Sequence, residues 1–332
     1  MTDFLYKPNY TITDEILMLV ASIAARIDVL SIQSGMDQNP KLRRINRLRS
    51  IHSSLAIENN SLSLEQITAL FDGKRILAPA QDICEAQNAF EVYDRLLKLN
   101  PYDVHDLLAA HRILMKDLVK IPGQFRTEGI GVFRGEEIVH IAPPAANVSG
   151  LIADLLKWTE LAEVHPLIKS CVFHYEFEII HPFPDGNGRM GRMWQTLLLY
   201  RWKQIFAWLP VETMIWESQQ EYYAALGNSN NAGDCTEFLK YMLHAVWDTL
   251  QLYASADQVT DQVTDQVTDQ VKHLLSVLDT KTLSTAEIMD LLNLKHRPTF
   301  RKNYLHPALK AGLVQMTSPE TPNARNQKYR RA

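Results

Sequence analysis

The sequence has few cysteines, no long apolar run and no apolar leader. Cys84, Cys171 and Cys235 are the only cysteines in 332 residues. They are odd in number and form no CxxC pair, which argues against a disulfide framework or a cysteine metal site. No run approaches the roughly 18 apolar residues of a membrane span, and MTDFLYKPNY lacks the basic and apolar regions of a signal peptide. These absences predict a cytoplasmic protein with buried thiols.

Composition and charge point to a globular body with a basic tail. The 46% hydrophobic and 22% charged content is ordinary for a folded protein, and the length allows about two domains. From Lys295 to the end, nine Lys or Arg stand against one acid, so this stretch carries +8, whereas the preceding 294 residues carry −12. The tail alone therefore has the charge of a nucleic acid binder.

Most of the chain follows a helical pattern, with apolar residues recurring at spacings of three and four. One exception is Gly123 to Pro144, where two apolar stretches flank Arg134-Gly135-Glu136 and two prolines close the segment. This pattern predicts a β-hairpin flap on a helical body. The expected helices are Ile16–Leu30, Arg43–Ile57, Leu64–Phe71, Ile83–Leu97, Val104–Leu118, Leu151–Leu161, Leu167–Ile180, Met193–Ile205 and Phe238–Leu252.

A four-residue repeat, DQVT, fills Asp257 to Val271. Its β-branched content and lack of large apolar residues indicate a linker or a marginal helix, with a self-associating coil as the alternative. Three short helices and a small hairpin are expected beyond it, which predicts a winged helix. Arg297, Arg301 and Lys302 would open its third helix. This domain would bind DNA, or else serve in protein docking or self-association.

The richest stretch for chemistry is HPFPDGNGRMGR, from His181 to Arg192, between two expected helices. Residues 186–188 would lie at a helix N-terminus, where free amides and the helix dipole favour an anion. Arg189 and Arg192 are three residues apart, so they would share a helix face and could both reach a polyphosphate. The stretch therefore predicts an anion-binding loop.

Two further residues of this loop indicate a reaction rather than binding alone. A carboxylate among phosphates is repulsive unless a cation lies between them, so Asp185 predicts a Mg²⁺ ion. His181, with an ordinary pKa near 6.5, is suited to accept a proton from a hydroxyl group. Taken singly, the residues would be a loop histidine, a tight turn, a helix cap and solvated arginines. Their coincidence favours phosphoryl or nucleotidyl transfer.

The stretch resembles the motif HxFx(D/E)GNGRxxR of the Fic (filamentation induced by cAMP) family, and every fixed position matches. HPLIKSCVFHYEFEIIHPF, GQFR and the paired prolines are also similar to that family, so the resemblance covers about Leu77 to Tyr253. It implies a Fic helical bundle, AMP transfer from ATP to a protein hydroxyl, and a flap that aligns the target. His181 would be the base and Asp185 the Mg²⁺ ligand. Phosphate binding would fall to Gly186, Asn187, Gly188, Arg189 and, for the γ-phosphate, Arg192.

Upstream, SSLAIENN places Ser54 and Glu58 four residues apart, on an expected helix of about residues 43–58. This spacing would let the serine steady the carboxylate; alone, the pattern would be a helix end with a solvated acid. Beside a Fic motif it resembles the family's inhibitory (S/T)xxxE(G/N) element, ending at Asn59. The resemblance implies that Glu58 pairs with Arg192 and blocks the γ-phosphate, so that the resting enzyme is weakly active.

We therefore expect a mainly α protein, with a helical region at 1–76, a Fic catalytic domain at 77–253, a linker at 254–271 and a winged helix at 272–332. The leading hypothesis is an autoinhibited protein adenylyltransferase that acts on a Tyr, Ser or Thr hydroxyl and also modifies itself. Removal of AMP, with Glu58 positioning a water, is a second hypothesis. A DNA-binding regulator with a nucleotide-sensing body is a third. The expected partners are ATP, Mg²⁺, a protein substrate, DNA and a second copy of the chain.

Overall fold

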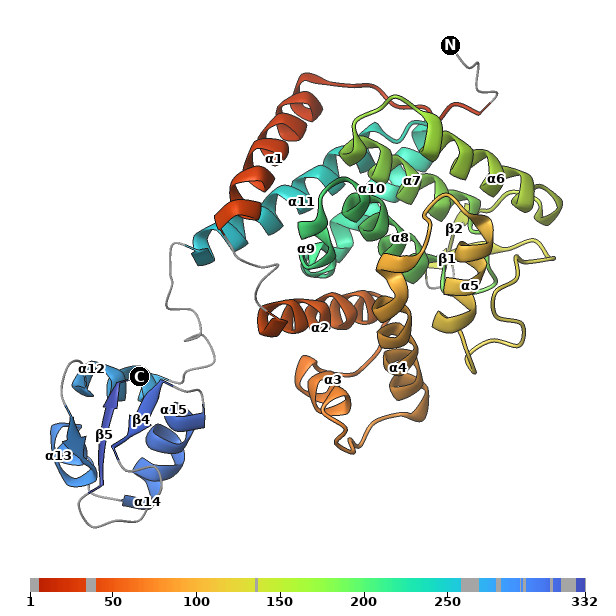
Figure 1. Ribbon diagram of the computed structural model, residues 1–332. Helices are drawn as coiled ribbons and strands as arrows, with labels where there is room; N and C mark the ends of the chain where they lie inside the picture. Colours follow the sequence, from red (N-terminus) through yellow and green to blue (C-terminus); the bar gives the residue numbers. More distant parts are fainter. Residues whose placement is uncertain are drawn as a thin grey trace. The chain divides into compact units, whose positions relative to one another are not determined.

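The computed structural model describes residues 6–33, 40–134, 137–257, 269–278, 282–292, 294, 297–310, 313–317 and 327–331. The chain forms two compact units, residues 1–254 and 255–332 (Figure 1). Most of the DQVT repeat, residues 258–268, lies outside the described residues, so its predicted role as a linker stays a prediction. The turn of the predicted flap, Gly135 and Glu136, also lies outside them.

Helices build the first unit, as the apolar periodicity predicts, and the fold class is mainly α. Most expected ends lie within three residues of the observed ones, but the helix expected to reach Leu118 stops at Leu114. The helices expected to begin at Leu151 and Met193 begin six residues earlier, and the helix expected to end at Leu252 runs five residues further. The helices of this unit are α1 (Asp14–Gln33), α2 (Pro40–Ile57), α3 (Leu64–Phe71), α4 (Ala80–Arg95), α5 (Val104–Leu114), α6 (Ala145–Leu161), α7 (Pro166–Ile180), α8 (Asn187–Trp202), α9 (Val211–Glu217), α10 (Gln219–Ala232) and α11 (Thr236–Asp257), with 3₁₀ turns at Leu96–Lys98 and Gln204–Ala207.

Helices α7 and α8 lie side by side in the middle of this unit (Figure 1). Their side chains include Phe173, Phe177 and Trp194, all fully buried. Burying such large rings removes about 150–250 Å² each from water and supplies much of the hydrophobic stabilisation. Because both helices are packed on several sides, the loop that joins them is held at both ends.

Helix α2 is fixed to the core by a buried carboxylate. Glu212 on α9 is 1% exposed and accepts hydrogen bonds from Ser50 on α2 (2.9 Å), Tyr93 on α4 (3.3 Å) and Thr196 on α8 (3.1 Å). A buried carboxylate is unfavourable unless donors surround it, so these hydroxyl groups stabilise one arrangement of the four helices. The N-terminus of the following helix, α3, carries the capping box of Ser63 and Gln66.

The predicted hairpin is present as an antiparallel pair, β1 (Gly131–Arg134) and β2 (Glu137–Ile141), with an irregularity between Val132 and Phe133. Pro143 and Pro144 follow, and α6 begins directly after them. The hairpin is the only sheet in the described part of the first unit.

The second unit has its own core, which includes Leu274, Ile288, Phe300 and Tyr329. Helices α12 (Asp269–Leu278) and α13 (Thr285–Leu291) precede a helical stretch of α14 (Arg297–Phe300), a π-helical turn (Arg301–Leu305) and α15 (His306–Lys310). Strands β3 (Leu283–Ser284), β4 (Val314–Met316) and β5 (Lys328–Arg331) form an antiparallel sheet in the order β3-β5-β4. The sequence predicts the helices and the β4–β5 pair but not β3. The side chain of Lys302 lies outside the described residues.

Among the described residues, no helix has both the length and the apolar character that a bilayer crossing requires.

Candidate active site

The loop between α7 and α8 begins and ends with a left-handed residue. His181 closes α7 at φ 48°, and Gly186 precedes α8 at φ 82°. Positive φ is unfavourable for residues with a Cβ, so the strained His181 is a feature that its surroundings must hold in place. At Gly186, an added Cβ would lie 2.6 Å from Sδ of Met115. Only glycine fits this position without displacing Met115.

The ring of His181 is oriented by the helix that it ends. Its Nδ1 lies 3.4 Å from the carbonyl oxygen of Glu178. Because a carbonyl only accepts, Nδ1 carries the proton in the neutral ring, and Nε2 is left as the acceptor. Burial lowers the pKa of His181 below its ordinary value. The ring is therefore neutral at pH 7, with a nitrogen that can accept a proton.

Arg126, at the base of the flap, holds the backbone on both sides of His181. Its guanidinium group donates to the carbonyl oxygens of His181 (2.8 Å), Ile180 (3.2 Å), Pro143 (2.5 Å) and Glu128 (2.9 Å). The residue is 3% exposed. A cation at the last carbonyls of α7 also complements the negative end of the helix dipole. Arg126 thus joins the flap to the strained end of α7.

Asn187 closes the loop upon itself. Its Oδ1 accepts from the backbone N–H of Phe183, and its Nδ2 donates to the carbonyl oxygen of Phe183, both at 2.9 Å. The residue is 2% exposed, so its amide shapes the loop and does not point to an open phosphate site, unlike the sequence-based expectation. The first backbone bond of α8 joins Met190 to Gly186. The amides of Gly188 and Arg189 precede it and can therefore meet an anion.

His111 on α5 contacts the α7–α8 loop at Phe183 and Asp185. Its ring stacks on Phe183 with centroids 3.6 Å apart. Nδ1 accepts from the N–H of Gly123 at 2.8 Å, which leaves the proton on Nε2 to donate to the carbonyl oxygen of Asp185 at 3.0 Å. Burial lowers the pKa of His111 to about 4, so the ring is neutral and both nitrogens are satisfied.

Asp185 presents a largely exposed carboxylate at the loop. Its Oδ1 accepts from the N–H of Gly186 at 2.6 Å and lies 3.5 Å from Nη2 of Arg189. Oδ2 makes no hydrogen bond or ion pair within the described residues, and the side chain is 61% exposed. No group of three or more His, Cys, Asp or Glu that could hold a metal ion gathers among the described residues, at this loop or outside it. A single open carboxylate fits Mg²⁺, which takes few protein ligands beside phosphate and water.

Arg192, on the next turn of α8, is occupied by the end of α2. Its Nη2 donates to Oε1 of Glu58 at 2.7 Å and to the carbonyl oxygen of Ser54 at 3.0 Å, and its Nε donates to the hydroxyl of Ser54 at 3.2 Å. Burial by itself would lower the pKa of Arg192, but the Glu58 carboxylate outweighs it and raises that pKa. The Arg192 side chain is 1% exposed, so the arginine side of the ion pair is shielded from water, whereas the Glu58 side chain is 32% exposed.

Glu58 also covers the start of α8. A Cβ added at Gly188 would clash with Oε1 of Glu58 and would lie 3.0 Å from Nη1 of Arg192. The Glu58 carboxylate therefore lies against the first turn of α8, whose backbone N–H groups are the ones that could bind an anion. Ser54 bonds to the arginine, whereas the sequence-based expectation was that it would steady Glu58.

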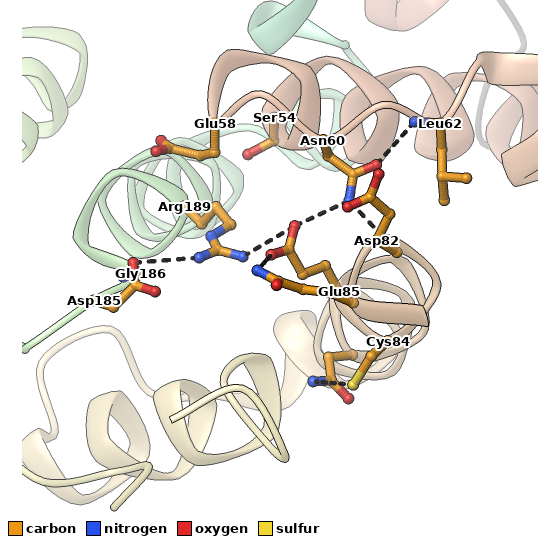
Figure 2. A network of polar contacts seen from close by, with 12 residues as sticks. Ser54, Glu58, Asn60, Leu62, Asp82, Cys84, Glu85, Asp185, Gly186 and Arg189 are labelled. Carbon is orange, nitrogen blue, oxygen red and sulfur yellow. Dashed lines mark hydrogen bonds and ion pairs between the residues drawn. The ribbon is translucent and has the colours of Figure 1, made fainter. Parts of the chain in front are cut away.

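Arg189 has a different environment from Arg192. Its Nη1 lies 3.7 Å from Oε2 of Glu85 on α4, and its Nη2 faces Asp185 (Figure 2). The side chain is 7% exposed and lies between the two carboxylates. The predicted pair of phosphate-binding arginines is thus divided between two ion-pair systems.

The structure brings the predicted site residues together around the α7–α8 loop and the start of α8, where Ser54 and Glu58 meet α8 although they precede it by more than 120 positions. Sequence reasoning assigned no role to His111, Arg126 or Glu85. Arg126 is the last residue of GQFR, a segment that resembles a known family, so the sequence does carry a signal for it. For His111 and Glu85, single polar residues on helices, the sequence carries no comparable signal.

Two family models match the chain. The Fic/DOC family model matches residues 101–199, and the model described as "Filamentation induced by cAMP protein Fic-like, C-terminal domain" matches residues 269–332. The first range holds the α7–α8 loop, and the second covers the second structural unit.

Similar curated proteins bear the name protein adenylyltransferase. The protein adenylyltransferase fic-1 of Caenorhabditis briggsae is 28% identical over 219 residues, which cover 62% of this chain and 41% of that protein. The protein adenylyltransferase Fic of Aedes aegypti is 27% identical over 240 residues, which cover 67% of this chain and 45% of that protein. The chain therefore spans less than half the length of these curated relatives.

Solved structures extend the similarity to the whole chain. Fic-1 of C. elegans (aa134–508) matches with a TM-score of 0.62 at 21% identity, covering 74% of both chains, which shows a shared fold. A Fic family protein from Desulfovibrio desulfuricans G20 matches with a TM-score of 0.76 at 47% identity, covering 98% of both chains. At this identity and coverage, the chain belongs to the Fic family.

Proposed function

We propose that this protein is an adenylyltransferase that transfers AMP from ATP to a hydroxyl group of a protein, and that Glu58 restrains it. The observation that carries the proposal is the arrangement around the start of α8. A neutral histidine with an available Nε2, an exposed carboxylate and an N-terminal helix turn surround one site, and a carboxylate just beyond the end of α2 pairs with the arginine of that site. The family membership and the names of the relatives support the same reaction.

In the proposed reaction, Nε2 of His181 accepts the proton of the target hydroxyl. The hydroxyl oxygen attacks the α-phosphorus of ATP and forms a new P–O bond, while the bond to the bridging oxygen of the β-phosphate breaks. Pyrophosphate leaves with the electron pair of that bond. The amides at the start of α8 and the guanidinium group of Arg192 bind its charge.

Asp185 would hold Mg²⁺ through its open oxygen. The ion supplies charge neutralisation between this carboxylate and the ATP phosphates. Asn187 and His111 keep the loop in the shape that presents Asp185, because their hydrogen bonds go to loop backbone atoms.

The proposed restraint follows from competition for Arg192. While Glu58 occupies the guanidinium group, the γ-phosphate has no access to it, and the carboxylate repels phosphate charge at the same turn. ATP would then bind in an unproductive position. Self-modification is expected when Glu58 is removed, since the chain itself carries Ser, Thr and Tyr hydroxyl groups that could serve as targets.

The experiment that tests this function uses the purified chain and its Glu58→Gly variant with α-labelled ATP, Mg²⁺ and cell lysate. Transfer predicts labelled protein bands that are stronger with the variant, and, when the purified chain is incubated without lysate, self-labelling by α-labelled but not by γ-labelled ATP. Removal of AMP is the competing function: the variant would then fail to release label from a modified protein that the wild type does release. If no label is transferred to protein and none is released from a modified protein, the proposed enzyme activity is rejected.

For the second unit, we propose a winged helix that binds duplex DNA. Its exposed Arg297, Lys328 and Arg330 contribute to a strongly basic tail, and its helices precede a small antiparallel sheet. Protein docking and dimer formation are the alternatives, and measurements of duplex binding and of oligomeric state distinguish them.

A further inference from the structure

Glu58 is not an internal residue of α2 but lies just beyond its end. The helix stops at Ile57, and Asn59 then turns the chain with φ 64°. The backbone N–H groups of Glu58 and Asn60 both donate to the carbonyl oxygen of Leu55. Helical hydrogen bonding therefore ends here, so the position of the Glu58 carboxylate depends on what holds the residues that follow.

The residues that follow are held by α4. Nδ2 of Asn60 donates to Oε2 of Glu85 at 2.9 Å and to the carbonyl oxygen of Asp82 at 3.2 Å, while its Oδ1 accepts from the N–H of Leu62 at 3.1 Å (Figure 2). Asn60 is 8% exposed. The next residue, Ser61, bonds to the Asp82 carboxylate through its N–H and its hydroxyl. The chain two residues after Glu58 is thus fixed to the first turns of α4.

The Glu85 carboxylate contacts both Asn60 and Arg189. The same oxygen, Oε2, accepts from Asn60 and lies 3.7 Å from Nη1 of Arg189, while Oε1 accepts from Gln81 at 3.2 Å. Arg189 in turn faces Asp185. A series of side-chain contacts therefore connects Asn60 through Glu85 and Arg189 to Asp185 (Figure 2).

These contacts connect the residues that follow Glu58 to the proposed ATP-binding loop, and Arg192 is not one of the residues involved. Glu85 is 8% exposed, and a buried carboxylate is tolerated only where charge and hydrogen bonds compensate it. Arg189 divides one positive charge between Glu85 and Asp185, each at or beyond ordinary hydrogen-bond distance. The hydrogen bond from Asn60 is therefore a substantial part of what stabilises Glu85 in this position.

We propose that Asn60 and Glu85 are positioning residues that hold Glu58 against Arg192. The Asn60–Glu85 hydrogen bond fixes the chain beyond α2 to α4. The 3.7 Å ion pair of Glu85 with Arg189 includes no hydrogen bond, so the Asn60–Glu85 bond is the contact that positions Glu58. A withdrawal of Glu58 that moves its backbone would then break the Asn60–Glu85 bond as well as the Glu58–Arg192 bond. This inference rests on the proposed inhibitory role of Glu58 and adds to it a second contact, outside Arg192.

The test is a compensating pair of substitutions. Asn60→Asp keeps the acceptor for Leu62 but places a carboxylate beside Oε2 of Glu85, so we expect release of the segment. Glu85→Gln keeps an acceptor for Asn60 and should stay repressed. The double variant restores a donor–acceptor pair, because the amide of Gln can donate to the new carboxylate. Glu91→Gln is the matched control, since Glu91 lies on α4, is 43% exposed and pairs with Arg95, its one ion-pair partner within the described part of the chain.

Two measurements are made on each full-length variant: self-labelling by ATP, and hydrogen exchange of the peptide covering residues 55–62. Asn60→Asp should raise self-labelling roughly tenfold, the usual effect of losing a hydrogen bond to a charged group, and should speed exchange. The double variant should return both to within about twofold of wild type. Adding Asn60→Asp to Glu58→Gly should give no further labelling, because the restraint is already absent.

Wild-type labelling and exchange in Asn60→Asp would overturn the inference, as would a double variant that stays released. If Asn60→Asp does not fold, Asn60→Ala removes the donor without adding charge, and wild-type labelling and exchange in that variant would equally overturn the inference. Hydrogen exchange keeps the inference separate from the proposed function. If even Glu58→Gly transfers no AMP, the enzyme assignment fails, while unchanged exchange in a folded Asn60 variant is a failure of the positioning role alone.

Discussion

Oε1 of Glu58 lies 2.7 Å from Nη2 of Arg192, although 134 positions separate the two residues in the chain. The arginine is almost fully buried, whereas the carboxylate is one-third exposed. Removing one partner of an ion pair whose other member is buried is unfavourable, so an anion beside this arginine is stabilising. In the proposed mechanism a γ-phosphate replaces Glu58, and the two anions would then compete for one guanidinium group.

The first prediction concerns this competition. Glu58→Gly should raise AMP transfer, including self-labelling, by about tenfold or more, which corresponds to about 1.4 kcal/mol of competition removed. Glu58→Gln should raise it less if the shape of the side chain also blocks ATP. Arg192→Ala should not mimic the release, since it removes the phosphate contact together with the inhibitory pair. Wild-type transfer by a folded Glu58→Gly variant with normal ATP binding would contradict the inhibitory role.

The second prediction concerns the proton acceptor. His181→Ala should lower transfer by about 10² to 10⁴ and leave ATP binding largely intact, because the phosphate contacts lie elsewhere. Only the neutral ring can accept a proton, and burial lowers the pKa of His181. The rate should therefore be constant near neutral pH and fall on acidification only below pH 6.5. A fall centred above pH 6.5 in the Glu58→Gly background would contradict the environment described for this ring.

Much of the fold follows from local sequence patterns. The helix from Leu64 to Phe71 is predicted to the residue, because the capping box of Ser63 and Gln66 marks its start and Gly73 its end. By contrast, α9 and α10, from Val211 to Ala232, are not predicted, since polar residues interrupt their apolar pattern. Glu212 shows why: its carboxylate is buried by hydroxyl groups from three other helices, an arrangement that a single segment does not encode.

The candidate site likewise combines residues whose proximity is visible in the sequence with residues whose proximity is not. The residues from His181 to Arg192 form one contiguous motif, so their proximity is visible in the sequence. The partners that fix them, His111, Arg126 and Glu85, come from three separate segments and act through backbone carbonyls or a shared arginine. Such contacts depend on how helices pack, and packing follows from the sum of many weak interactions rather than from a spacing rule.

The third prediction concerns Arg126, which donates to the carbonyl oxygens at the end of α7. Arg126→Ala should lower the melting temperature and reduce transfer about tenfold or more, since the strained His181 loses its support. Arg126→Lys should not restore the rate, because one ammonium group cannot replace a planar fork that reaches several acceptors. Thermal melting and steady-state labelling check both statements. Full activity in Arg126→Lys would show that charge alone is sufficient.

The fourth prediction concerns the metal. Asp185→Ala should raise the Mg²⁺ concentration required for ATP binding and should stop transfer at low Mg²⁺, with partial recovery at high Mg²⁺ if the phosphates retain the ion. Chelation with EDTA should abolish transfer by the Glu58→Gly variant. Titration of a fluorescent ATP analogue at several Mg²⁺ concentrations measures the binding step apart from the reaction. Equal transfer with and without EDTA would remove the metal role of Asp185.

The last prediction separates the two units. The second unit has its own buried core, and the proposed catalytic residues all lie before Ala254, so deletion of residues 255–332 should leave self-labelling by the Glu58→Gly variant unchanged. If the basic tail contacts DNA phosphates, the full chain should bind random duplex with an affinity that falls steeply with salt, because each phosphate contact releases a counterion. The deletion variant should lose that binding. Duplex affinity that persists after the deletion would place the nucleic acid surface on the Fic body. A salt-independent loss of dimers, seen by light scattering, would instead assign the second unit to self-association.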